Sequence, residues 1–159
     1  MPGNIAHLRV SAPRRFFGLG VLLLLAGVVL YIAMARPPEA LGWRAFLLGL
    51  GVVVLVLGVK MHRATKRSLT LTEEGLSDSD GRILARLEEI EAVDRGLFAF
   101  KPSNGFVLKL KQPQGIVWAP GLWWRLGRRV GVGGVTSAVQ AKVMAEALET
   151  ALAERAAAR

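Results

Sequence analysis

The chain has 159 residues, of which 52% are hydrophobic, and Lys and Arg outnumber Asp and Glu by 21 to 12. It contains no cysteine, which excludes disulfides, thiolate metal sites, iron–sulfur clusters and a cysteine nucleophile. A basic chain raises the question of nucleic-acid binding. Here residues 1–67 hold nine basic residues and one acidic residue, and they flank apolar segments. Membrane topology accounts for that charge, so we expect no nucleic-acid partner.

Residues 1–15 are predicted to form a basic arm on the cytoplasmic side, with Arg9, Arg14 and Arg15 next to the first apolar segment. A basic start followed by an apolar run also resembles a signal peptide, with Ala33-Met34-Ala35 as its cleavage site. The apolar run is longer than the h-region of a signal peptide. We therefore interpret it as an uncleaved first membrane span.

Two apolar segments follow each other over residues 16–59. Residues 16–35 carry no charge, and residues 41–59 carry only Arg44, one turn inside the segment. At about 1.5 Å per residue, a helix over 16–35 is about 30 Å long, the thickness of the hydrocarbon core of a bilayer. The sequence Arg36-Pro37-Pro38-Glu39 cannot continue a helix. The pattern predicts a transmembrane helical hairpin made of helices 16–35 and 41–59.

Charge around the hairpin predicts its orientation. Residues 60–67 form a basic linker with Lys60, Arg63, Lys66 and Arg67, whereas the short turn between the helices carries only Arg36 and Arg44 against Glu39. Positive charge favours the cytoplasmic side. We expect a membrane protein with both termini in the cytoplasm.

Glycines recur at heptad spacing in both apolar segments, as Gly20 and Gly27, Gly42 and Gly49, Gly51 and Gly58. In lipid, small residues allow close approach of helix backbones. The glycines therefore pack the hairpin against itself, or they leave a face that docks another membrane protein.

From residue 68 the pattern changes to short alternating segments separated by turn residues. Strands are predicted at 68–72, 75–77, 82–85, near 92, at 98–100, 106–111, 116–118 and 128–132. Residues 87–93 are ambiguous, because Leu87, Ile90 and Val93 keep helical spacing for about one turn, and we interpret them as a helical turn leading into the strand near Ala92. Turns are expected at 78–81, 101–105 and 112–115.

The chain ends in a predicted amphipathic helix. Ser137 can cap its start, with Gln140 at the capping-box position. Its apolar positions recur at helical spacing through Ala141, Met144 and Leu148. The fold class is therefore α+β: a transmembrane helical hairpin, then a small antiparallel β-barrel or sandwich over residues 68–159 with a C-terminal helix.

The order of strands, the Asp78–Gly81 turn and the run Gly131–Gly134 leading into a helix resemble the pleckstrin-homology-like (PH-like) domains of small bacterial membrane proteins. Those domains often follow two membrane helices. The resemblance implies a protein of the bacterial inner membrane with a cytoplasmic PH-like domain over residues 68–159. In the lipid-binding members the loop between the first two strands is basic. Here Thr72–Asp80 contains four acids and no base, so we do not expect specific capture of a phosphorylated headgroup.

One segment combines three tryptophans with three arginines. Its candidate interface residues are Trp118, Trp123, Trp124, Arg125, Arg128 and Arg129. Tryptophan favours the headgroup zone, and arginine is attracted to an anionic leaflet. The same residue types are enriched at protein interfaces. Three interpretations stay open: packing of the domain core, a loop facing the membrane, and contact with a partner.

Catalytic patterns are nearly absent. His7 and His62 lie beside the apolar segments and lack partners at metal-ligand spacing. The acids Glu88, Glu89, Glu91 and Asp94 are typical of a solvated face. We expect no catalytic residue, cofactor or metal.

The leading hypothesis is a non-catalytic accessory or scaffold subunit of a larger membrane complex, whose partners are other integral membrane proteins and, non-specifically, anionic lipids. The alternatives are a peripheral sensor of anionic headgroups and, third, a membrane enzyme that uses the acidic strip.

Overall fold

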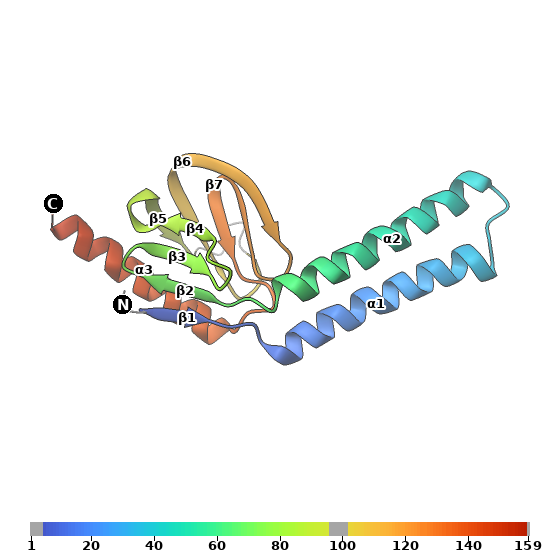
Figure 1. Cartoon of the computed structure of the whole chain (residues 1–159), viewed down its shortest axis with the longest axis horizontal. Helices are drawn as coiled ribbons and strands as arrows, with labels where there is room; N and C mark the ends of the chain where they lie inside the picture. The colour runs from blue at the N-terminus through green and yellow to red at the C-terminus, as the bar shows by residue number, and fades with distance from the viewer. Residues whose placement is uncertain (1–4, 96–101, 159) are drawn as a thin grey trace.

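The computed structural model describes residues 5–95 and 102–158, in which two long helices project from a β-rich body (Figure 1). Helix α1 spans Ala12–Ala35 and helix α2 spans Leu41–Ala64, and both are long and apolar enough to cross a membrane. Two long apolar helices are thus confirmed. Each has 24 residues and is about 36 Å long. Both extend past their predicted bounds at the end next to the body, so most of the expected linker 60–67 belongs to α2.

The two helices pack antiparallel along their length through small residues. On α1 the buried positions are Ala26, Val29 and Ala33, and α2 buries Gly51, Val54, Gly58, Met61 and Ala64 against the rest of the chain. Most other apolar side chains of the pair point outward; Leu24, for example, is 70% exposed. The helical hairpin is therefore apolar on nearly all sides, and the contact surface between α1 and α2 is narrow.

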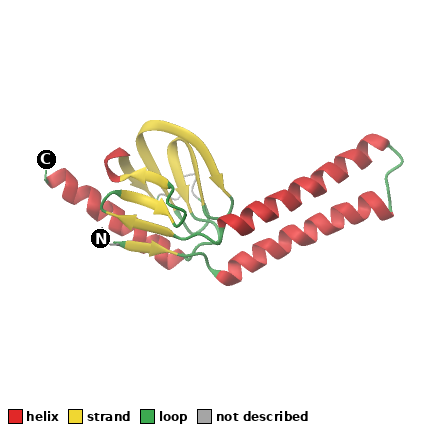
Figure 2. Ribbon diagram, in the orientation of Figure 1, coloured by secondary structure: helices red, strands yellow, loops and turns green. Residues whose placement is uncertain are grey.

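The first sheet contains four antiparallel strands in the order β1-β2-β3-β4 (Figure 2). They are β1 Ala6–Leu8, β2 Leu69–Thr72, β3 Gly75–Asp78 and β4 Ile83–Arg86. Strand β1 was not predicted, because the sequence places it in a polar arm. It pairs with β2 through Ala6↔Leu71 and Leu8↔Leu69, and Leu8 is fully buried. Strand β1, which precedes the helical hairpin in the sequence, therefore adds an edge strand to the sheet whose other strands follow the hairpin.

The turn between β3 and β4 is the one predicted at residues 78–81. Gly81 has φ +80°, and Asp78 Oδ1 accepts hydrogen bonds from the N–H groups of Asp80 (3.1 Å) and Arg82 (2.9 Å). Arg67 forms ion pairs with Asp78 at 3.6 Å and with Asp80 at 2.6 Å. One of the expected linker charges thus stabilises this turn.

The second sheet has the order β5-β6-β7, with β5 Ile90–Asp94, β6 Phe106–Ala119 and β7 Trp123–Val132. The short helix η1 Leu87–Glu89 precedes β5, as predicted. The turn expected at 112–115 is wrong: β6 is continuous there, and Pro113 lies where the register between β6 and β7 shifts. Proline is tolerated in a strand at such irregular positions because no ladder hydrogen bond is lost. The strand predicted at 98–100 lies outside the described residues, as does residue 101 of the next turn.

Helix α3 Ala138–Ala157 packs against β1, β5 and β6 with its predicted apolar side, burying Ala141, Met144, Ala145 and Leu148. The capping box expected at its start is not formed. Ser137 makes no side-chain cap, and Gln140 Oε1 instead accepts the N–H of Arg9 at 2.8 Å. The two sheets do not close into a barrel. Side chains from both sheets and α3 form one core.

Candidate functional site

The segment rich in tryptophan and arginine is not a loop, as the sequence suggested, but the end of the β6–β7 hairpin. Its turn contains Pro120 and Gly121, and Gly121 has φ +79°. Proline before glycine is typical of a type II turn, in which the second central residue needs positive φ. A Cβ on Gly121 would lie 3.2 Å from Thr65 Cγ2 and 3.3 Å from Met61 Cε. The turn therefore lies directly against the end of α2.

The same junction holds the beginning of α1. The N–H of Ser11 donates to Val135 O at 2.9 Å, and Arg14 Nη1 donates to Thr136 O at 2.8 Å. A Cβ on Gly18 would lie 2.8 Å from Met61 Cε and 3.8 Å from Val135 Cγ1. Body and hairpin are thus joined by direct packing of both helices against the β6–β7 turn and the segment after β7.

The three tryptophans of the segment have three different environments. Trp123 is 1% exposed and belongs to the core. Trp124 is half-buried, and its ring covers Gly131 so closely that a Cβ there would overlap it. Trp118 is opposite Trp124 in the ladder and remains 59% exposed. Of the three, only Trp118 presents a largely free indole.

The three arginines also separate. Arg125 Nη1 donates to Leu84 O at 3.1 Å and to Gln114 Oε1 at 2.7 Å, and its Nε donates to Gly115 O at 3.0 Å. It therefore bridges β4 of one sheet and β6 of the other. Arg128 donates to Leu110 O at 3.0 Å and pairs with Glu91 at 3.1 Å. Within residues 5–95 and 102–158, no side-chain hydrogen bond or ion pair is found for Arg129, which is exposed.

Two exposed residues of this hairpin were missed by the sequence reasoning. Ile116 is 76% exposed and Leu126 is 58% exposed. Val117 and Ala119 pack on the core, so Ile116 and Trp118 point to the opposite face of β6 by strand alternation. Alternation along residues 123–126 would have revealed Leu126 had that stretch been assigned to a strand. We call Ile116, Trp118 and Leu126 the outer apolar face.

The predicted helix-packing glycines also divide into two groups. Gly51 and Gly58 are buried, but only Gly51 is in close contact: a Cβ there would lie 2.5 Å from Leu30 Cδ2 of α1, whereas a Cβ on Gly58 would meet no atom within 4 Å. The other four are exposed, and a Cβ built on any of them meets no atom within 4 Å: Gly20, Gly27, Gly42 and Gly49. The contact between α1 and α2 uses Gly18 as well, which the heptad pattern did not include.

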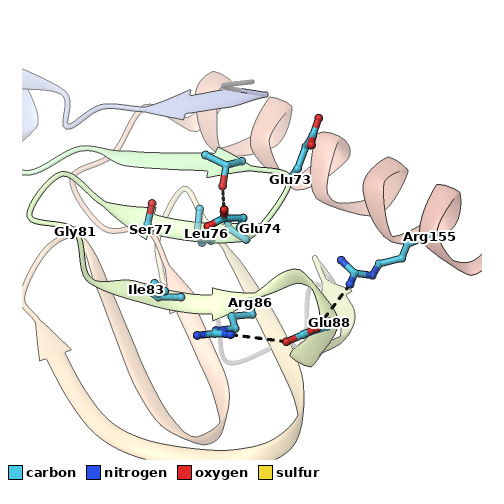
Figure 3. Close-up of a pocket in the computed structure, with 11 residues that line it drawn as sticks. Glu73, Glu74, Leu76, Ser77, Gly81, Ile83, Arg86, Glu88 and Arg155 are labelled. Atoms are coloured by element: carbon cyan, nitrogen blue, oxygen red, sulfur yellow. Dashed lines mark hydrogen bonds and ion pairs between the residues drawn. The ribbon is translucent and has the colours of Figure 1, made fainter. Parts of the chain in front are cut away.

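The strongly charged hollow of the body lies between the β2–β3 turn, β4 and the end of α3 (Figure 3). It is open, has a volume of about 820 Å³ and carries Glu73 and Glu74 on one rim. Glu88 lies between two guanidinium groups, 4.0 Å from Arg86 Nη1 and 3.7 Å from Arg155 Nη2. Its arginines are thus already paired with a carboxylate, which disfavours an added phosphate.

The remaining acids of the strip are also engaged by polar groups. Glu89 Oε2 accepts from Arg86 N at 3.1 Å and from Gln114 Nε2 at 2.8 Å. Glu91 pairs with Lys109 at 2.9 Å, and this hydrogen bond, with the positive charge of Lys109 and Arg128, holds its pKa below the usual 4.5. A catalytic acid at neutral pH needs the opposite shift.

The two histidines are far from forming a metal centre. His7 lies in β1, where its Nδ1 is 3.2 Å from Thr70 Oγ1, and His62 is half-buried in α2. Across residues 5–95 and 102–158, no three His, Asp or Glu side chains gather at metal-binding distance.

Comparison of the chain with models of protein families, with curated proteins and with solved structures found no match.

Proposed function

We propose that the chain is an integral protein of the bacterial inner membrane, a non-catalytic accessory or scaffold subunit of a larger membrane complex. Its hairpin spans the bilayer, and its PH-like body lies in the cytoplasm. The length and outward-facing apolar side chains of α1 and α2 support the span. The exposed Trp43 lies near the far turn of the hairpin, as expected of a tryptophan at a membrane interface.

Charge supports the orientation. The end of the hairpin that adjoins the body (Figure 1) carries exposed or half-exposed Arg14, Arg15, Lys60 and Arg63, whereas the far turn carries only Arg36 and Arg44 against Glu39. By the positive-inside rule the body is cytoplasmic.

The observation that carries the accessory role is the group of uncovered glycines. Gly51 packs against Leu30 within the hairpin, but Gly20, Gly27 and Gly49 are exposed and remain open on the outside of the same two helices. In lipid, a bare glycine face gains from a second helix, because it lets backbones approach closely. A partner span is thus a natural occupant of these faces.

The experiment is purification of the full chain from its native membrane at endogenous level in a gentle detergent, followed by native gels. Wild type should migrate within a larger assembly. Gly49→Leu should release the chain from it, whereas the matched change Val52→Leu, at an exposed non-glycine position, should not. A lone monomer for wild type would overturn the proposal.

Non-specific attraction to anionic lipids is the second candidate. The exposed guanidinium of Arg129 and the basic residues where the helical hairpin joins the body favour it. Each such charge near an anionic surface contributes about 1 kcal/mol of attraction. The full chain in nanodiscs should melt higher with anionic than with neutral lipid. Equal melting temperatures would remove this candidate.

A further inference from the structure

We propose that the outer apolar face of the β6–β7 hairpin, Ile116, Trp118 and Leu126, is a membrane-contact surface that inserts into the headgroup layer beside α2. The proposal rests on the proposed membrane span and adds a second, non-spanning attachment. The surface contacts the lipids of the cytoplasmic leaflet, on the side where the body lies.

Position is the first support. In Figure 1 the second half of β6 crosses the end of the body that faces along the helices, and it runs crosswise to the helix axes. It ends beside α2, where Gly121 contacts Met61 and Thr65. This half of β6 therefore borders the side of the body that faces the helices, and Ile116 and Trp118 leave it on the side away from the core.

Depth is the second support. The predicted apolar span of α2 ends at Val59, and at about 1.5 Å per residue Met61 and Thr65 lie about 3 and 9 Å beyond it. The headgroup zone is about 5–8 Å thick on each side of the hydrocarbon. The β6–β7 turn is thus held at headgroup level by its packing on α2. Trp118 is only three residues from Gly121 along the strand, so it lies close to the same level.

Chemistry is the third support. Ile116, Trp118 and Leu126 are 76%, 59% and 58% exposed, and they gather on one face of a single hairpin. Tryptophan prefers the membrane–water interface, where its ring is in apolar surroundings and its N–H reaches polar groups. Exposed cations of α2, Lys60 and Arg63, lie near the same turn and suit an anionic leaflet.

Arg125 and Arg128 are engaged within the body and are not part of the outer apolar face. Their guanidinium groups hold the curved hairpin in shape by donating to Leu84 O and Leu110 O.

The test uses the absence of cysteine, which makes any introduced thiol unique. Single variants Ile116→Cys, Trp118→Cys and Leu126→Cys of the full chain carry a nitroxide and are placed in nanodiscs with one copy each. Collision rates with oxygen, which partitions into lipid, and with a water-soluble nickel chelate give the depth of each label. One copy per disc excludes burial by a second copy.

Two control positions make the outcomes separable. Leu24→Cys reports the middle of α1, and Ala153→Cys reports the end of α3, at the opposite end of the molecule from the hairpin (Figure 1). We expect the labels at 116, 118 and 126 to be several-fold less accessible to the nickel chelate than the label at 153. Chelate access equal to that at 153, with a lipid-exposed label at 24, overturns this inference alone. A water-exposed label at 24 overturns the membrane span and this inference together.

Discussion

Replacing Arg125 by alanine should destabilise the body, although the sequence placed this residue at an interface. The side chain donates three hydrogen bonds of 2.7–3.1 Å to Leu84 O, Gly115 O and Gln114 Oε1. Hydrogen bonds to charged groups contribute about 1.5–3 kcal/mol each, but water can replace part of this at a half-exposed site. We therefore expect a net loss of about 2–3 kcal/mol.

The assay is thermal unfolding of the full chain in detergent, followed by tryptophan fluorescence. In a chain of this size, 1 kcal/mol shifts the melting temperature by about 2–4 °C, so Arg125→Ala should lower it by about 5–10 °C. Arg129→Ala is the matched control and should shift it by less than about 2 °C, since that side chain is exposed. Arg125→Lys should fall between the two, because an ammonium group cannot reproduce the planar fork. Equal shifts for Arg125→Ala and Arg129→Ala would refute the bridging role.

Three further predictions concern other parts of the structure. Leu8→Ala should cost about 2–5 kcal/mol, because Leu8 is fully buried in the body; a neutral effect in the same melt would contradict the pairing of β1 with β2. Gly51→Leu should lower the melting temperature, because the leucine side chain would overlap Leu30 of α1, whereas Gly49→Leu should leave it unchanged. A lower melting temperature for Gly49→Leu alone would mean that Gly49, and not Gly51, faces α1. Glu91 has a pKa lowered by the hydrogen bond from Lys109, so its contribution to stability is present above pH 4.5 and lost as pH falls through the lowered value. The melting difference between wild type and Glu91→Gln should therefore vanish in acid, and a difference that grew there would contradict the sign.

Local patterns predicted much of the fold. The helices α1 and α2, the break at Pro37 and Pro38, and the Asp78–Gly81 turn all follow from the composition of short windows. The same is true of the apolar stripe of α3. In each case neighbouring residues contain the signal, because helix length, turn conformation and helical periodicity are local properties.

Strand β1 could not be predicted in this way. Ala6–Leu8 is a three-residue strand separated from its partner Leu69–Thr72 by the entire hairpin, so its pairing is a long-range contact. The capping box expected at Gln140 failed for the same reason. Arg9, which directly follows β1, donates its N–H to Gln140 Oε1, so a long-range contact replaces the local one.

The tryptophan–arginine segment shows the same division at the candidate site. Its composition marked residues 118–129 as unusual, but it could not say that Trp123 lies in the core, that Trp124 covers Gly131 or that Arg125 bridges two sheets. Those outcomes depend on the curvature and shifted register of β6 and β7, which decide the face each side chain takes.

The sequence by itself therefore determined two long apolar helices flanked by basic residues, and a β-rich body that ends in a helix. Hydrophobic periodicity and charge are local properties that can be read from short stretches of the chain. Only the tertiary structure decided which end of the β6–β7 hairpin meets α2, which glycines stay open, and which one of three tryptophans is left exposed. Contacts between distant segments set these, and no short window of sequence contains them.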